Sequence, residues 1–170
     1  MNLTLRSFLP ALLFAATCLG AVGKPNLVVF ISDDLGRLDT SIHGSKDVRT
    51  PTMDLLAAGG MTFDDAYVAS PSCCPSRFSL LTGLMPARHG AHPNHSQVKP
   101  GTKFLMPILK NMGYHVASFG KVAHGNRDFE GMDFNNPKRT GMSVEVEKYF
   151  SKTKIDGPVC LLVGDRRPHV

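Results

Sequence analysis

Three short apolar runs constrain the fold of this chain more than any other feature of its sequence. They span residues 26–31, 114–119 and 158–163, and each contains Val among mostly apolar residues. Runs of this length are typical of strands that are buried in a parallel sheet. Segments with helical patterns occur between them, at residues 50–60, 75–82, 103–111 and 143–152. Because strands alternate with helices, the sequence predicts an α/β fold around a mostly parallel sheet.

The first of these helices has the clearest start signal. Thr50 is expected to be its N-cap, with Pro51 at the first helical position. Its predicted apolar face consists of Met53, Leu55, Leu56 and Ala57. Residues 61–68 are then expected to form a second strand or an extended segment, and residues 124–141 a loop.

Residues 1–23 have the features of a signal peptide. Arg6 precedes an apolar stretch, and small residues lead to a predicted cleavage site near Gly23. An uncleaved membrane anchor is the alternative, but the stretch is short for a bilayer span and contains Pro10. The remaining sequence has no other run long enough to cross a bilayer. We therefore expect residues 24–170 to be exported, to the periplasm or the medium, without a stable membrane span.

The charge of the chain is modestly basic. Its formal net charge of +5 becomes +4 without residues 1–23, which contain one Arg and no acid. Apolar residues make up 42% of the chain and charged residues 19%, a balance that is typical of globular proteins rather than disordered ones. The basic excess fits an anionic substrate, and we predict no nucleic-acid partner.

The cysteines give the first chemical clue. Cys18 is expected to leave with the signal peptide, so that Cys73, Cys74 and Cys160 remain. An odd number is unusual in an exported protein, where cysteines generally pair. Neighbouring cysteines can form a disulfide only with strain, and this spacing does not match a zinc knuckle. At least one cysteine is therefore expected to have a special chemical fate.

Two adjacent carboxylates, Asp33 and Asp34, follow the first predicted strand directly. Desolvating both is costly unless a cation lies between them, and calcium prefers oxygen ligands of this kind. A turn with two solvated acids is the alternative, and the pair considered alone favours that turn.

The segment from Cys73 to Gly83 reads Cys-Cys-Pro-Ser-Arg-Phe-Ser-Leu-Leu-Thr-Gly. It matches the type I sulfatase signature, Cys-x-Pro-Ser-Arg followed by Leu-x-Thr-Gly, with Cys74 at the variable position. The chain resembles this family over roughly residues 24–170. The resemblance implies that a formylglycine-generating enzyme oxidises Cys73 to formylglycine.

The chemistry of a hydrated aldehyde agrees with that implication. One of its two hydroxyls attacks sulfur and displaces the alcohol, and the other then loses its proton, re-forms the aldehyde and expels sulfate. A helix start favours negative charge at the attacking group. Arg77, one turn further along, is expected to stabilise the hydrate.

The resemblance assigns the other site residues. Residues 24–36 resemble the first strand of the family, which implies that Asp33 and Asp34 bind calcium together with residue 73. Residues 113–124 resemble a segment in which Lys121 binds a sulfate oxygen and His124 assists collapse of the hydrate.

The end of the chain adds one more site residue. His169 ends a Gly-x-x-x-Pro-His segment, residues 164–169, that is similar to the family's, and the resemblance implies that it contacts the sulfate ester. The spacing from Lys121 to His124 is most similar to that of the iduronate-2-sulfatase branch.

The resemblance also implies an alkaline-phosphatase-like sandwich with a mostly parallel central sheet, incomplete at the C-terminus. Residues 24–170 are then the N-terminal part of a catalytic domain that hydrolyses sulfate esters, with sulfated sugars as the expected substrates. The alternatives are an inactive truncated fragment or a module that binds sulfated glycans. A phosphoesterase of the same broad fold is a third possibility, although that class commonly uses Thr or Ser as nucleophile.

Overall fold

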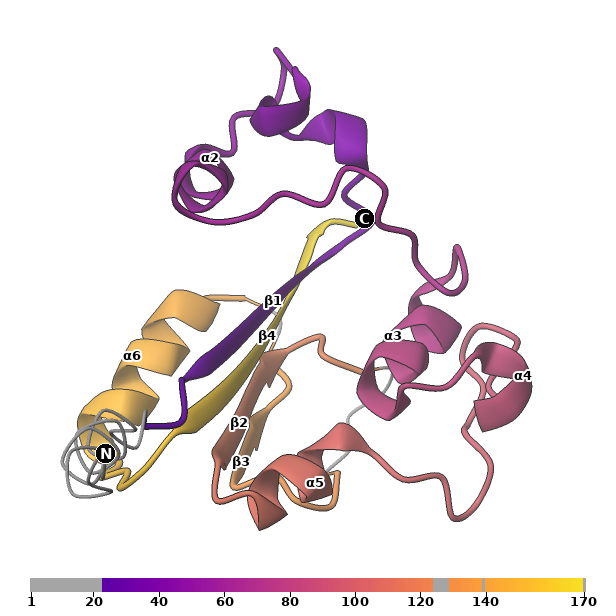
Figure 1. Cartoon of the computed structure of the whole chain (residues 1–170), viewed down its shortest axis with the longest axis vertical. Coiled ribbons are helices and arrows are strands. Elements are labelled where there is room, and N and C mark those ends of the chain that lie inside the picture. The colour runs from indigo at the N-terminus through magenta and orange to yellow at the C-terminus, as the bar shows by residue number, and fades with distance from the viewer. Residues whose placement is uncertain (1–22, 124–128, 139, 170) are drawn as a thin grey trace, which may run out of the picture.

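The computed structural model describes residues 23–123, 129–138 and 140–169 (Figure 1). The predicted signal peptide up to residue 22, Cys18 and His124 lie outside these described residues. The described chain contains one sheet of four parallel strands in the order β1-β4-β2-β3. Figure 1 shows α6 on one face of this sheet and α3 and α5 on the other. The α/β prediction with a parallel sheet is confirmed.

The strands are β1 Leu27–Asp33, β2 His115–Gly120, β3 Phe134–Asn136 and β4 Val159–Pro168. The last of them extends five residues beyond its predicted end at Val163. The strand β3 was predicted as loop. Its three residues have no local strand pattern and owe their conformation to pairing with β2, where Phe134 lies opposite Ala117.

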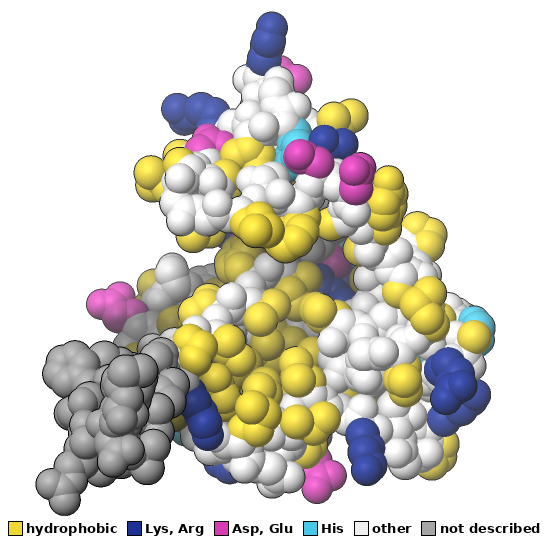
Figure 2. All heavy atoms as spheres, viewed as in Figure 1, with side chains coloured by type: hydrophobic (Ala, Val, Ile, Leu, Met, Phe, Trp, Pro, Cys, Tyr) yellow, Lys and Arg dark blue, Asp and Glu magenta, His cyan; other side chains and the backbone are white. Residues whose placement is uncertain are grey.

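The strand β1 is an edge strand rather than the fully buried strand that the sequence predicts. Leu27 and Val29 pack against the core, whereas Val28 is 68% exposed and Phe30 is 57% exposed. The face of β1 that carries Val28 and Phe30 is open because α6 packs on β2. Figure 2 shows hydrophobic side chains gathered over this region of the molecule.

The α-helices are α2 Pro51–Gly59, α3 Cys73–Thr82, α4 Pro86–His89, α5 Leu105–Asn111 and α6 Met142–Lys152. Two short 3-10 helices precede them, η2 Arg37–Asp39 and η3 Ser41–His43. The helix α3 begins two residues before the predicted start at Pro75. It ends at Gly83, whose left-handed backbone conformation (φ 68°) terminates the helix as glycine does readily.

The apolar face predicted for α2 is exposed. None of its residues is buried, and Leu55 and Leu56 are 75% and 71% exposed. Figure 1 shows α2 beyond the end of the sheet, away from the core. Thr50 does not cap the helix with its side chain. Its hydroxyl instead lies 2.7 Å from the hydroxyl of Ser41, which also donates to Asp54 Oδ2 at 2.8 Å.

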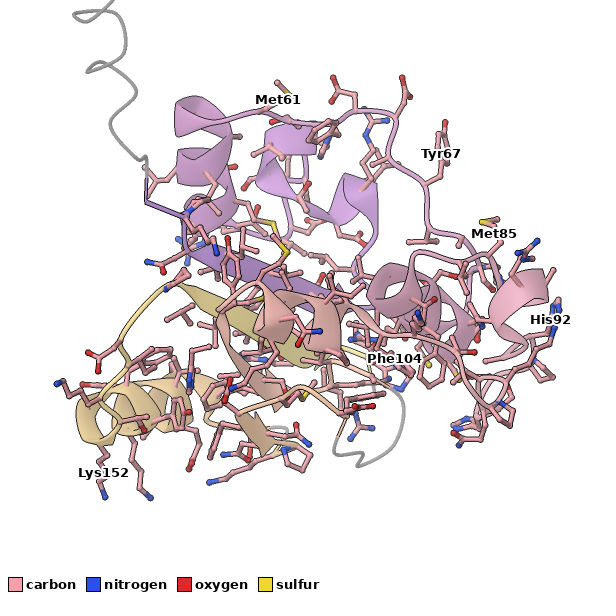
Figure 3. The ribbon with its side chains drawn as sticks, turned by 60° about the horizontal axis from the view of Figure 1, so that its bottom comes forward. Met61, Tyr67, Met85, His92, Phe104 and Lys152 are labelled. Atoms are coloured by element: carbon pink, nitrogen blue, oxygen red, sulfur yellow. The ribbon has the colours of Figure 1, made fainter. Side chains whose placement is uncertain are left out.

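The segment 61–68 contains no strand. Met61 and Tyr67, which are 77% and 88% exposed, point away from the rest of the molecule (Figure 3). The apolar residues of this segment therefore lie neither in a strand nor in the core.

The core lies between the sheet and the layer formed by α3, α4 and α5. Its most buried members include Phe78, Leu81, Met106, Val116, Cys160 and Leu162. Phe104 closes it from the side, with its ring centroid 6.2 Å from that of Phe78 (Figure 3). In the described ranges, no helix combines the length and the hydrophobicity that crossing a membrane requires.

Candidate active site

The candidate site lies at the carboxyl ends of three neighbouring parallel strands, where ligands bind in sheets of this type. Asp33 is the last residue of β1, Lys121 follows β2 and His169 follows β4. Asp33 contacts Lys121, and Asp34 contacts His169. The carboxyl ends of these three strands therefore lie close together.

A buried cluster of three charged side chains forms the floor of the site. Asp33 Oδ1 accepts a hydrogen bond from Arg77 Nη2 at 2.9 Å, and Asp33 Oδ2 accepts one from Lys121 Nζ. All three side chains are less than a tenth exposed. Two cations thus share one carboxylate. Uncompensated charge is costly to bury, so this cluster favours an additional anion nearby.

The cluster keeps Asp33 ionised. Burial alone would raise the pKa of Asp33, but the hydrogen bonds and positive charges of Lys121 and Arg77 outweigh burial and hold the pKa below its usual value. The carboxylate is therefore negatively charged at neutral pH and serves as the bridge between the two cations.

Two glycines allow the strand ends to approach closely enough for this cluster. A side chain at Gly164 would collide with the carbonyl of Lys121, and one at Gly120 would collide with the carbonyl of Gly164. Gly120 also has a left-handed φ of 72°. With no side chains in the way, the N–H of Lys121 donates to the carbonyl of Gly164 at 2.8 Å. The backbone of Lys121 is thereby fixed beside β4.

Arg77 joins α3 to the strand ends. Besides its contact with Asp33, its Nη1 donates to the carbonyl of Lys121 and, at 3.5 Å, to that of Val122. Its guanidinium is therefore held by the protein on several sides and lies one helical turn after Cys73. Arginine suits this role because its planar group presents several donors in fixed directions.

Cys73 opens into a pocket of about 260 Å³ whose lining includes Asp33, Asp34, Ser76 and Arg77. The structure thus brings together the predicted nucleophile, both predicted metal ligands and the predicted arginine. Lys121 does not line this pocket and lies behind Asp33.

The backbone separates the two adjacent carboxylates. Asp34 has a left-handed φ of 64°, a conformation that Asp tolerates better than most residues. Asp33 consequently points into the protein, whereas the Asp34 side chain is 60% exposed and contacts His169 Nδ1 through Oδ2. His169 also lines a larger neighbouring cavity of about 1150 Å³ beside α6.

Similarity to known proteins identifies the family of this chain. The profile of the family described as Sulfatase matches residues 25–156. The chain belongs to the sulfatase family. The curated relatives of this sulfatase chain include an N-acetylgalactosamine-6-O-sulfatase of Bacteroides thetaiotaomicron, 35% identical over 148 residues, which make up 82% of this chain and 29% of that protein.

Two further relatives agree. An ulvan-active sulfatase of Formosa agariphila is 29% identical over 86% of this chain and 30% of its own length. Arylsulfatase A of Bos taurus is 40% identical over 62% of this chain and 22% of its own length. The sulfatase chain therefore spans less than a third of each of these three relatives.

Solved structures support the fold. An enzyme in complex with its substrate D-glucosamine-2-N,6-O-disulfate matches with a TM-score of 0.76 at 22% identity, over 86% of this chain and 35% of that one. A phosphonate monoester hydrolase of Agrobacterium radiobacter matches with a TM-score of 0.75 at 17% identity, over 86% and 42% of the two chains. The predicted alkaline-phosphatase-like α/β fold is confirmed over the matched part.

The described part of the sulfatase chain does not assemble a complete metal site. Asp33 and Asp34 are oxygen donors of the kind that calcium prefers, and both line the pocket with residue 73. However, within residues 23–123, 129–138 and 140–169 no group of three His, Cys, Asp or Glu side chains could hold a metal ion. Calcium usually takes about six to eight oxygens, so these ligands fit in kind but need further oxygens.

Sequence reasoning missed one residue at the nucleophile position. Asn94 Oδ1 accepts hydrogen bonds from the Cys73 thiol at 3.2 Å and from the Cys74 N–H at 3.3 Å. Asn94 lies in a segment whose His, Pro and Gly residues predict only a loop. Nothing local to that segment indicates that it folds over a helix start twenty residues away.

Proposed function

We propose that this sulfatase chain supplies the nucleophile and much of the anion-binding floor of a sulfuric ester hydrolase. The buried Asp33–Arg77–Lys121 cluster carries the proposal, because it places excess positive charge behind the pocket that Cys73 lines. A sulfate ester is a compact anion, and its charge compensates the excess. Positive groups fixed in advance also stabilise charge that develops on the sulfate oxygens during transfer.

The proposed nucleophile is residue 73 as a formylglycine hydrate. A modifying enzyme supplies the oxidant for the two-electron oxidation of the Cys73 side chain, in which the C–S bond breaks, the sulfur leaves as sulfide and the carbon becomes an aldehyde. One hydroxyl of the hydrate attacks sulfur and the alcohol leaves. The second hydroxyl then loses its proton, the aldehyde forms again and sulfate departs. Residue 73 begins α3, and the free backbone N–H groups of a helix start favour negative charge there.

The surrounding side chains have distinct proposed roles. Arg77 stabilises the hydrate, and Lys121 binds a sulfate oxygen after exchanging its contact with Asp33. His169 contacts the ester after leaving Asp34. His124 is proposed to hydrogen-bond the hydrate and assist its collapse.

Calcium is the proposed metal, held by Asp33, Asp34 and an oxygen of residue 73, with water or other groups completing its coordination. When bound, it would supply positive charge beside the sulfate oxygens. The two carboxylates contact Lys121, Arg77 and His169, all of them basic side chains. Because the carboxylates already attract positive groups, a divalent cation is a chemically consistent ligand.

The proposed substrates are the sulfated sugars of polysaccharides or of glycosaminoglycan fragments. The relatives support this class, since their names include ulvan and N-acetylgalactosamine 6-sulfate as targets. The spacing from Lys121 to His124 makes an iduronate-2-sulfatase-like specificity a further prediction. The proposed partners are accordingly a sulfated glycan and a formylglycine-generating enzyme.

The test is an assay of the complete gene product, produced together with a formylglycine-generating enzyme, on an aryl sulfate and on sulfated oligosaccharides. Cys73→Ala should abolish turnover. Cys74→Ser is the matched control, because a hydroxyl can keep the contact that the buried Cys74 thiol makes with the Ser96 carbonyl at 3.3 Å. Removing calcium with a chelator should abolish activity, and adding calcium should restore it.

Three results would contradict the proposal. The first is no turnover despite formylglycine at residue 73 and added calcium, and binding of sulfated glycans under those conditions would identify a non-catalytic module. The second is turnover by the Cys73→Ala variant. The third is hydrolysis of phosphate esters in clear preference to sulfate esters, which would identify a phosphoesterase.

A further inference from the structure

We propose that Asn94 is a positioning residue that fixes the orientation of the catalytic group at residue 73. The inference rests on the proposed function and adds a residue to it. It starts from an unusual convergence, since one amide oxygen accepts hydrogen bonds from three donors. These are the Cys73 thiol at 3.2 Å, the Cys74 N–H at 3.3 Å and the His95 N–H at 3.1 Å.

The convergence fixes which end of the Asn94 amide faces the helix. An amide oxygen accepts hydrogen bonds and an amide nitrogen only donates them, so three donors require the oxygen at this position. The Cys74 N–H is one of the backbone groups that a helix start leaves without a partner inside the helix. Asn94 thus performs the task of an N-cap from a distant loop, while the side chain of Ser72, the residue in the capping position, makes no such bond.

The loop that carries Asn94 is held in place independently of residue 73. The Cys74 thiol donates to the Ser96 carbonyl at 3.3 Å. His95 has a left-handed φ of 64°, which is unfavourable for a residue with a side chain and persists only where the surroundings impose it. The loop is therefore a fixed support for the amide oxygen.

This arrangement matters for a hydrate because its two hydroxyls are chemically identical but must perform different tasks. Asn94 is not among the residues that line the pocket with Cys73. A hydroxyl that takes over the hydrogen bond of the thiol is therefore held toward Asn94, which leaves the second hydroxyl for the pocket. An amide oxygen is too weak a base to remove the proton, so the contribution of Asn94 is orientation.

The experiment compares three variants of the complete, formylglycine-containing protein. Asn94→Ala removes the acceptor, and Asn94→Asp keeps an acceptor oxygen in a side chain of the same shape. Ser96→Ala is the matched control, since it removes a hydrogen bond from the same loop and leaves Asn94 intact. For each variant kcat, KM, melting temperature and the formylglycine content of the peptide around residue 73 are measured.

We expect Asn94→Ala to lower kcat roughly tenfold, the equivalent of one lost hydrogen bond, with KM changed less than about twofold. Formylglycine content should equal that of the wild type. Asn94→Asp should recover most of kcat, and Ser96→Ala should remain within about twofold of the wild type. If the alanine variant does not fold, Asn94→Leu takes its place, because leucine has nearly the shape of asparagine but no acceptor oxygen and should show the same loss of kcat relative to Asn94→Asp.

Several outcomes would overturn the inference. They are a wild-type kcat for Asn94→Ala, an equal loss in Ser96→Ala, an Asn94→Asp variant as slow as the alanine variant, and a loss that matches a fall in formylglycine content. Turnover by the wild type distinguishes a failure of this inference from a failure of the proposed function. Wild-type turnover with an unaffected Asn94→Ala variant rejects the inference alone, whereas a formylglycine-containing wild type without turnover rejects the proposed function.

Discussion

Arg77 Nη2 lies 2.9 Å from Asp33 Oδ1, and neither side chain is more than 5% exposed. The two residues are 44 positions apart, so this ion pair joins α3 to the end of β1. It also determines where the start of α3, and with it residue 73, lies relative to the sheet. The pair is thus a structural support as well as part of the site.

Removing the arginine should therefore destabilise the fold. Arg77→Met keeps much of the side-chain volume but leaves Asp33 with Lys121 alone, and we expect a loss of about 3 kcal/mol in the free energy of unfolding. Urea denaturation measures this loss. The control is Arg37→Met, since Arg37 is 55% exposed and lies 3.7 Å from an exposed Asp64 carboxylate. That variant should lose less than about 1 kcal/mol, and equal losses in both variants would contradict the argument.

The close approach of the strand ends gives a second prediction. Gly164→Ala places a methyl group against the carbonyl of Lys121, which is backbone and cannot move aside easily. We expect a loss of about 1–3 kcal/mol in unfolding free energy and a loss of sulfatase activity. Gly59→Ala is the control, because nothing lies within 4 Å of the added atom and alanine is the better helix residue. Thermal melting should show a lower Tm for Gly164→Ala and an unchanged or higher Tm for Gly59→Ala.

The buried His89 predicts a dependence of stability on pH. Burial lowers its pKa, and the neighbouring charges of His92 and Lys99 act in the same direction. The N–H of Ala91 donates to His89 Nδ1 at 3.1 Å, which identifies the neutral ring with its proton on Nε2, 3.1 Å from the Ser79 hydroxyl. Folding thus favours the neutral form.

The sign of the pH effect follows from this lowered pKa. The unfolded chain takes up a proton on His89 below about pH 6.5, while the folded chain does so only at lower pH. Stability contributed by the neutral ring is therefore complete above that pH and is lost as the pH falls toward the folded pKa. Unfolding free energies measured from pH 7.5 to 5 should decline in the wild type, and the decline should be shallower in His89→Gln. Identical slopes would exclude His89 as the cause.

The three described cysteines, Cys73, Cys74 and Cys160, differ in exposure. Burial raises the pKa of the Cys74 thiol and of the Cys160 thiol, and both side chains are almost completely buried. Thiol reagents attack the thiolate, so a raised pKa and burial both slow the reaction. In protein produced without the modifying enzyme, a thiol reagent followed by peptide mass spectrometry should label Cys73 first. Labelling of Cys160 at the same rate would contradict the packing described.

The parts of the fold that the sequence predicted are those with local signals. The signature segment predicted α3 because Pro75 and Gly83 mark a helix start and end within a few residues. The parallel sheet was likewise predicted from three short apolar runs that alternate with helical segments.

The remainder depends on long-range packing. The sequence of α2 has an apolar face, but only the tertiary structure determines whether another element covers it, and here none of its residues is buried. The strand β3 depends on its neighbour β2, and the position of Asn94 depends on a loop returning to α3. The pairing of Asp33 with Arg77 likewise joins residues whose separation in sequence hides their contact.

The position of β1 at the edge of the sheet has a consequence for handling the protein. One side of its backbone has no neighbouring strand in the described sheet, and Val28 and Phe30 are exposed beside it. Such an edge is a template for another extended chain. In concentrated solutions, copies of the protein should therefore self-associate through β1. Val28→Lys or Phe30→Lys should prevent this association, and light scattering should then show a single monomeric species.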